Sequence, residues 1–211
     1  IIQKYSQRGF DITDYYGDNE FRKVETFLLP AHSHICGANQ HVDRVERSVR
    51  TTKERIRCMA CSVPFNKMPR VMIKHMVVSA TSWLNAFPSN NGVSRDMSPN
   101  AIVLGSPPPD FTRLKLRFGA YVQLYVGTTN TPRQRMVGAI ALREASEEGT
   151  YFFMSLETGR ELHGSQYTEL PIDNHIIQRV HELATAEGQP HMHNGPLFEW
   201  SPGVPIDDDA E

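Results

Sequence analysis

The sequence predicts an α+β or α/β chain in two parts, the first with long helices and the second built from short strands. Residues 41–59 contain no glycine or proline and carry apolar side chains at helical spacing, which predicts a helix. Three consecutive prolines at 107–109 mark the main boundary. Beyond them, strand-like runs alternate with turn residues, as is typical of a small antiparallel barrel.

In the first part, capping residues and prolines predict where the helices begin and end. Asp43 suits the N-cap of the main helix, with Glu46 at the capping-box position three residues later. Pro69 suits the first position of a second helix, and we interpret the Met72, Met76 and Ser79 stripe of that helix as core. The expected order is a helix at 1–8, a strand at 10–16, a short helix or loop at 19–29, an extended segment near 34–35, helices at 43–61 and 69–87, and a short helix at 97–104.

The second part predicts strands followed by one amphipathic helix. Thr158 and Gly159 indicate a hairpin turn, and Asp173 caps a helix with apolar residues at helical spacing. From Gly188 the chain is polar and rich in proline, which predicts a disordered acidic tail at 188–211. The expected strand runs are 119–126, 137–142, 150–156 and 161–170.

The charge of the chain is unevenly distributed. The 211 residues carry a formal net charge of −2, but residues 41–74 hold nine basic and three acidic side chains, a local balance of +6. A basic block of this kind can engage phosphates although the remainder of the chain is acidic. No apolar run has the length of a membrane span, so we expect no membrane partner. The first residue is isoleucine and the N-terminus is no signal peptide, so we expect a piece of a longer chain.

The cysteines and histidines do not predict a zinc site. The three cysteines form no disulfide framework, which favours a reducing compartment. Cys58 and Cys61 form a lone C-x-x-C, and His32, His34 and Cys36 have no partner with ligand spacing.

The main helix could carry chemistry on one face. Glu46, Arg50, Lys53 and Arg57 fall on that face, beside an apolar stripe that we expect to be buried. The simpler interpretation is a solvated face with salt bridges. The alternative is a metal site, because an Asp after a strand and a Glu on a helix can hold Mg²⁺ for phosphodiester chemistry, with Arg50, Lys53 and Arg57 contacting DNA phosphates.

The motif order favours the second alternative, because it resembles the integrase of Copia-type LTR retrotransposons, especially a branch found in algal and other protist genomes. The likeness runs from Gly9 to about Ala184. It rests on G-D-N-E-F at 17–21, H-V-D-R-V-E-R-S-V-R-T-T-K-E-R at 41–55, W-L-N-A-F-P at 83–88, S-P-N-A-I-V-L-G at 98–105, F-G-A-Y-V-Q at 118–123, V-G-A-I-A-L at 137–142 and Y-F-F-M-S-L-E-T-G-R at 151–160.

The resemblance implies an N-terminally truncated RNase H-like integrase core followed by a small SH3-like barrel. Such enzymes join element DNA ends to target DNA by strand transfer, using Mg²⁺ (or Mn²⁺) held by two Asp and one Glu. Carried over, Asp18 is the second catalytic Asp and metal ligand, Glu46 is the catalytic Glu and metal ligand, and Arg50 and Lys53 contact DNA. The implied domains are a partial core at 1–106, a Pro-rich linker at 107–112, a barrel at 113–172, an amphipathic helix at 173–187 and the tail at 188–211.

The resemblance also implies binding partners, and it shows where this chain departs from the family pattern. The full-length protein would bind element ends and target DNA, self-associate and act in the nucleus. The family's first Asp lies on a strand that we expect ahead of Ile1, and the 27 residues between Asp18 and Glu46 are fewer than is usual in the family. We therefore expect the chain by itself to be inactive in strand transfer and marginally folded in its first half, with an open strand edge and helix faces that lack cover.

Two other interpretations remain open at the level of sequence. The chain could be a non-catalytic DNA-binding or scaffolding protein derived from a retroelement. It could also be an unrelated α+β interaction module, in which Asp18 is a turn residue and Glu46 a helix cap. In that last case the two carboxylates would lie more than about 10 Å apart, beyond a shared metal site.

Overall fold

The computed structural model has an α+β fold and describes residues 2–17, 19–28, 30–35, 43–90, 92–110, 112, 115–127, 134–145 and 149–192. The chain divides into two compact units. Unit 1 comprises residues 1–54 and 82–108, and unit 2 comprises residues 55–81 and 109–211. The predicted linker at 107–112 is therefore only one of the boundaries, because residues 55–81 group with the strand-rich part.

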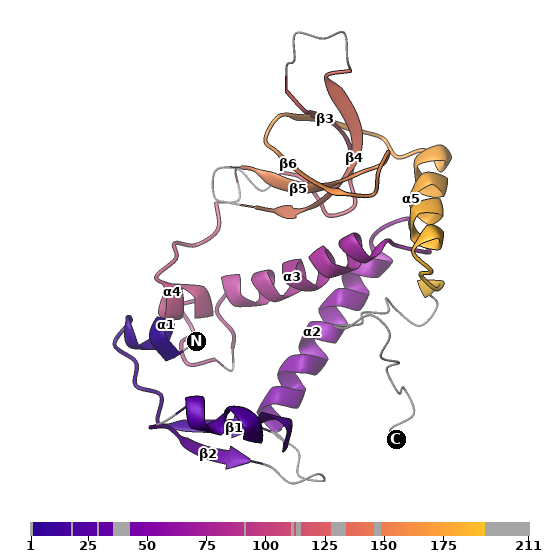
Figure 1. Cartoon of the computed structure of the whole chain (residues 1–211). Helices are drawn as coiled ribbons and strands as arrows, with labels where there is room; N and C mark the ends of the chain where they lie inside the picture. The colour runs from indigo at the N-terminus through magenta and orange to yellow at the C-terminus, as the bar shows by residue number, and fades with distance from the viewer. Residues whose placement is uncertain are drawn as a thin grey trace. The chain divides into compact units, whose positions relative to one another are not determined.

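Most predicted elements are present near their expected bounds (Figure 1). The strand expected at 10–16 begins four residues late, and the helix or loop at 19–29 is a 3₁₀ helix. The short helix at 97–104 starts at Pro99, with Ser98 as its N-cap and Gly105 as its left-handed C-cap. The elements are α1 (Ile2–Ser6), β1 (Asp14–Gly17), η1 (Asn19–Phe27), β2 (His32–Ile35), α2 (Asp43–Cys61), α3 (Arg70–Ala86), α4 (Pro99–Leu104), β3 (Tyr121–Tyr125), β4 (Met136–Glu144), β5 (Tyr151–Ser155), β6 (Glu161–Gly164), β7 (Tyr167–Leu170) and α5 (Asn174–Ala186).

Unit 2 is built on a five-stranded antiparallel sheet with the strand order β6-β5-β4-β3-β7. Its two edge strands, β6 and β7, follow each other in the chain and are separated only by Ser165 and Gln166. Because so short a connection joins opposite edges, the sheet must curl on itself. The amide of Tyr125 donates to the carbonyl of Gln166 at 3.0 Å, which ties β3 to this connection.

The single strand predicted at 161–170 is wrong, because the run divides into β6 and β7. Gly164 lies at the division. A Cβ at this position would come within 2.7 Å of Leu124 Cδ1, so a larger residue would collide with the side chain that packs there. Glycine thus allows the chain to leave β6 close to β3 and to begin β7 on its other side.

Both faces of the sheet of unit 2 are buried, and β4 shows this in its sequence. Ala139 and Ala141 pack on one face with Val122, Leu124 and Phe153. Ile140 and Leu142, the alternate residues, pack on the opposite face against helices. On β4, the small residues thus face the inside of the curl and the large residues face the helices, as the two-residue period of a strand requires.

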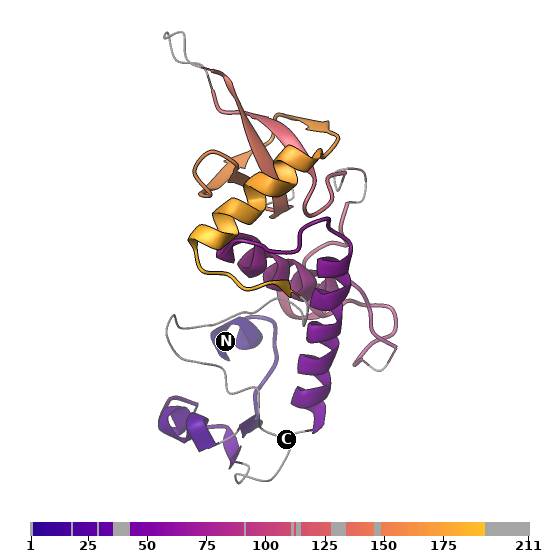
Figure 2. The ribbon, with the colours of Figure 1, turned by 90° about the vertical axis from the view of Figure 1, so that its right-hand side faces the viewer.

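Helices α3 and α5 cover the outer face of this sheet (Figure 2). Met72 and Met76 of α3 and Ile176 and Val180 of α5 join Ile140 in one buried cluster, which confirms the core interpretation of the methionines. Hydrogen bonds also connect the C-terminal part of α5 to the start of α3 and to the loop before it. Its C-cap residue Glu187 accepts a hydrogen bond from the amide of Arg70 at 2.7 Å, and His181 Nε2 accepts one from the amide of Asn66 at 3.0 Å.

Unit 1 contains a two-stranded parallel sheet, and few of its described side chains are buried. β1 and β2 pair in register from Asp14 with His32 to Gly17 with Ile35. Among the residues that the structure describes, Ala31 is the only buried hydrophobic side chain of unit 1. Trp83 and Phe87 stack on each other at 5.8 Å between ring centres but are 38% and 43% exposed. These two aromatic side chains of unit 1 are thus only partly covered.

Gly119 offers a test of how closely the loop after α2 packs against the start of the strand-rich part within unit 2. Its φ is +84°, and an added Cβ would lie 2.5 Å from Cγ1 of Val63. We expect Gly119→Ala to cost about 1–2 kcal/mol for the left-handed backbone and about 1–3 kcal/mol more for the collision.

The matched control is Gly149→Ala. Gly149 has a φ of +77° with nothing within 4 Å of an added Cβ, so its variant should show only the backbone cost. Urea unfolding of both variants measures the difference. Equal losses of stability would contradict the close packing of Val63 on Gly119.

Candidate functional site

The pairing of β1 and β2 brings the ends of both strands to one edge of the unit 1 sheet. The strands are parallel, and their last residues, Gly17 and Ile35, are partners in the register. Asp18 follows β1 directly in the chain and lies outside the described residues. Residues 36–42, which connect β2 to α2, lie outside them as well, and α2 begins at Asp43.

The same sheet carries a contact between a histidine and a carboxylate that the sequence did not reveal. His34 Nε2 lies 2.8 Å from Asp14 Oδ1, and the ring of His34 stacks on Tyr16 at 4.6 Å between ring centres. The pKa of Asp14 is lowered, first by the hydrogen bond to His34 and then by the one to Thr13. No local pattern could have predicted the pair, because its members are 20 residues apart and meet only through the strand register.

The predicted residues on α2 are exposed to solvent. Glu46, Arg50 and Lys53 lie on the part of α2 that belongs to unit 1, and Arg57 follows on the part that belongs to unit 2. All four side chains are exposed, so the cations are accessible to an anionic partner such as a phosphate backbone. The hydroxyls of Thr51 and Thr52 are occupied by the helix itself, because they donate to carbonyl oxygens four residues earlier.

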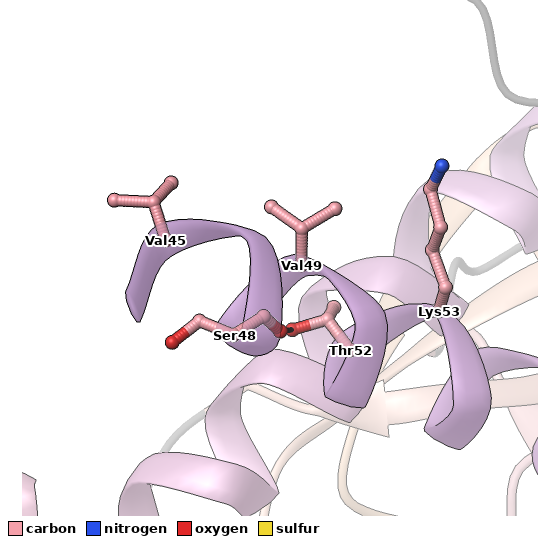
Figure 3. Close-up of a pocket in the computed structure, with 5 residues that line it drawn as sticks. All are labelled: Val45, Ser48, Val49, Thr52 and Lys53. Atoms are coloured by element: carbon pink, nitrogen blue, oxygen red, sulfur yellow. Dashed lines mark hydrogen bonds between the residues drawn. The ribbon is translucent and has the colours of Figure 1, made fainter. Parts of the chain in front are cut away.

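A shallow hollow follows the first turns of α2. Val45, Ser48, Val49, Thr52 and Lys53 line it, and Figure 3 shows Val45, Val49 and Lys53 projecting from the same side of the helix. The hollow thus combines an apolar floor with one cation at its end.

The expectation of one buried apolar stripe along α2 is wrong for its first half. Val45 and Val49 are 52% and 46% exposed, whereas Ile56 and Met59 pack against the core of unit 2. The reason is that the stripe runs from unit 1, whose described residues include almost no buried hydrophobic side chains, into unit 2, which holds the core.

The described residues contain no group of three or more His, Cys, Asp or Glu side chains arranged to hold a metal ion. Asp18, one member of the predicted pair with Glu46, lies outside that search. Cys58 and Cys61 are free, exposed thiols near the end of α2, and Cys36 is outside the described residues.

No protein-family model matches the sequence, and no curated protein is significantly similar to it. Within the described part of the chain, none of the helices combines the length and the apolar character that crossing a bilayer requires.

The division of the α2 stripe predicts a contrast between two substitutions. Val49→Ala should change the free energy of unfolding by less than about 0.5 kcal/mol, because the side chain is largely in water. Ile56→Ala should cost more than about 1 kcal/mol, because it removes a side chain packed on the core. Urea unfolding of both variants measures the contrast. A loss for Val49→Ala as large as for Ile56→Ala would show that the first half of α2 is covered in solution.

Proposed function

We propose that this chain is part of the integrase of a Copia-type retrotransposon. In this proposal it supplies the end of an RNase H-like core and an SH3-like barrel to an enzyme that joins element DNA to target DNA by strand transfer. Asp18 and Glu46 are two of the three carboxylates that hold Mg²⁺ or Mn²⁺ for in-line attack of a DNA 3′-hydroxyl on a phosphodiester. The partners are DNA and further copies of the full-length protein, in the nucleus.

The parallel pairing of β1 with β2 is the observation that carries the proposal. The chain leaves both strands at the same edge of the sheet, with Asp18 next after β1 and Glu46 in the first turn of the helix that follows β2. Catalytic groups in sheets with parallel strands gather where the carboxyl ends of the strands meet. A turn residue and a helix cap in an unrelated fold would not need this arrangement.

The strand order of unit 2 supports the second half of the proposal. Five short antiparallel strands, with the last one returning beside the first, are what an SH3-like barrel requires. β7 pairs with β3 from Tyr121 with Leu170 to Leu124 with Tyr167. The interior of the curl is filled by side chains, as in small barrels.

The exposed cations of α2 support contact with DNA. Arg50 and Lys53 lie one and two helical turns after Glu46, so phosphates bound by them would lie near a metal held at Glu46. Contacts of this type position the duplex without reading its sequence.

The experiment is a DNA-binding titration with the 211-residue chain and a labelled duplex carrying a retroelement end. Replacing Arg50 and Lys53 together by alanine should remove two phosphate contacts. The slope of log affinity against log salt should then fall by about 2, and affinity should drop roughly 10- to 100-fold near 0.1 M salt.

Lys23→Ala combined with Arg95→Ala is the matched control. It changes the net charge by the same amount at two other exposed cations of unit 1. The control variant should keep the parent slope and most of the affinity. Equal losses in the two double variants would show that binding depends on net charge alone and would contradict the assignment of Arg50 and Lys53.

A further inference from the structure

A buried histidine joins α3 to the sheet of unit 2 through two hydrogen bonds. His75 is 1% exposed. Its Nε2 lies 2.6 Å from Oε2 of Glu161 on β6, and its Nδ1 lies 3.1 Å from Nε of Arg143 on β4. These three residues, which we call the His75 network, come from three elements that are far apart in the sequence. The helical stripe of α3 gave no reason to expect a polar group there.

The partners determine where the proton of His75 lies. The Nε of arginine can only donate, so His75 Nδ1 must accept and therefore carries no hydrogen. The single proton is then on Nε2, which donates to the Glu161 carboxylate. Both bonds are made together only by neutral imidazole.

Other groups around the ring reinforce this arrangement. His163 Nε2 lies 3.2 Å from the second oxygen of Glu161, and Lys74 Nζ lies 3.8 Å from Oε2. The guanidinium of Arg143 lies over the ring of Phe152, 4.1 Å from its centre, which restricts its retreat from His75. The charged and titratable groups that face His75 are thus Glu161 and His163 on β6, Arg143 on β4 and Lys74 on α3 itself.

Burial lowers the pKa of His75, and the positive charges of Arg143 and Lys74 lower it further, whereas Glu161 acts in the opposite direction. At Glu161, partial burial raises the pKa, but the hydrogen bonds from His75 and His163 leave it lowered. Glu161 therefore keeps its charge while His75 titrates.

We propose that the His75 network is an acid-sensitive lock, which holds the unit 2 part of α3 against the sheet and releases it when His75 takes up a proton. A proton on Nδ1 would set two donors, imidazolium and guanidinium, against each other at 3.1 Å in a buried site. The bond to Arg143 is lost, and like charges then face each other. When α3 separates from β4, the two buried donors no longer face each other, and the repulsion between their charges is relieved.

The direction of the pH dependence follows from the lowered pKa. The unfolded chain binds the proton at the ordinary pKa of 6.5, before the folded chain does. The stabilisation is therefore complete above pH 6.5 and is lost progressively as the pH falls toward the lower folded value. One proton changes the opening equilibrium by at most about tenfold per pH unit.

Hydrogen exchange of the α3 amides between Met72 and Ser79 tests the lock in the full chain, from about pH 7.5 to about pH 5.5, across the ordinary titration range of histidine. The control is His75→Gln, which keeps a polar amide at the site but does not titrate there. Comparison at each pH cancels the intrinsic pH dependence of exchange. Protection of the parent chain relative to the variant should fall by up to about tenfold per pH unit below pH 6.5. A constant ratio across the range would overturn the proposal.

Arg143→Gln separates the lock from a purely structural contact. Without the guanidinium, a proton on Nδ1 no longer meets a fixed cation, so the acid-dependent part of the opening should shrink. Loss of protection by the same factor at every pH, with the acid dependence unchanged, would overturn the proposal. Should His75→Gln fail to fold, nitrogen NMR of the His75 ring in the parent chain decides instead. One protonated nitrogen at neutral pH supports the lock, and two overturn it.

Discussion

The burial of both faces of the unit 2 sheet is the constraint on which the rest of the structure depends. Ala139 and Ala141 face the inside of the curl, and Ile140 and Leu142 face the helices. Both faces of β4 are therefore packed against other side chains. A strand of this kind cannot shift its register by one residue without exchanging small for large residues on both faces. The positions of α3, α5 and the loop after α2 follow, because their apolar side chains complete the outer face.

This constraint also explains why the two long helices change character along their length. All buried residues of α3 lie in the part that belongs to unit 2, and on α2 Ile56 of unit 2 is packed on the core whereas Val49 of unit 1 is 46% exposed. Parallel strands such as β1 and β2 normally lie in sheets covered on both faces. In our proposal, the remainder of an integrase core would provide that cover and the third carboxylate, so the pair binds a metal ion in this chain but supports strand transfer only with the remainder in place.

Local signals predicted a large part of the fold. The bounds of α2 and α3 lie within one residue of those expected, and the predicted caps of α4 and α5 are present, as Asp173 shows by accepting from the amide of Ile176. The errors concern interactions between distant residues. The division of 161–170 depends on the space beside Leu124, and burial of His75 depends on Glu161 and Arg143, which no helical period reveals. Of the candidate site, the sequence predicted the helix and its exposed cations, but it could not show that Val45 and Val49 lack cover.

The central claim is that Asp18 and Glu46 share a divalent metal ion, and paramagnetic broadening by Mn²⁺ tests it most directly. In amide NMR spectra of the chain, added Mn²⁺ should broaden the signals around both residues together. Asp18→Asn or Glu46→Gln should each weaken the broadening at both places, whereas Glu54→Gln, a matched change on the same helix, should leave it unchanged. Broadening around only one of the two residues, or broadening that each substitution removes only at its own position, would contradict the shared site and with it the proposed integrase chemistry.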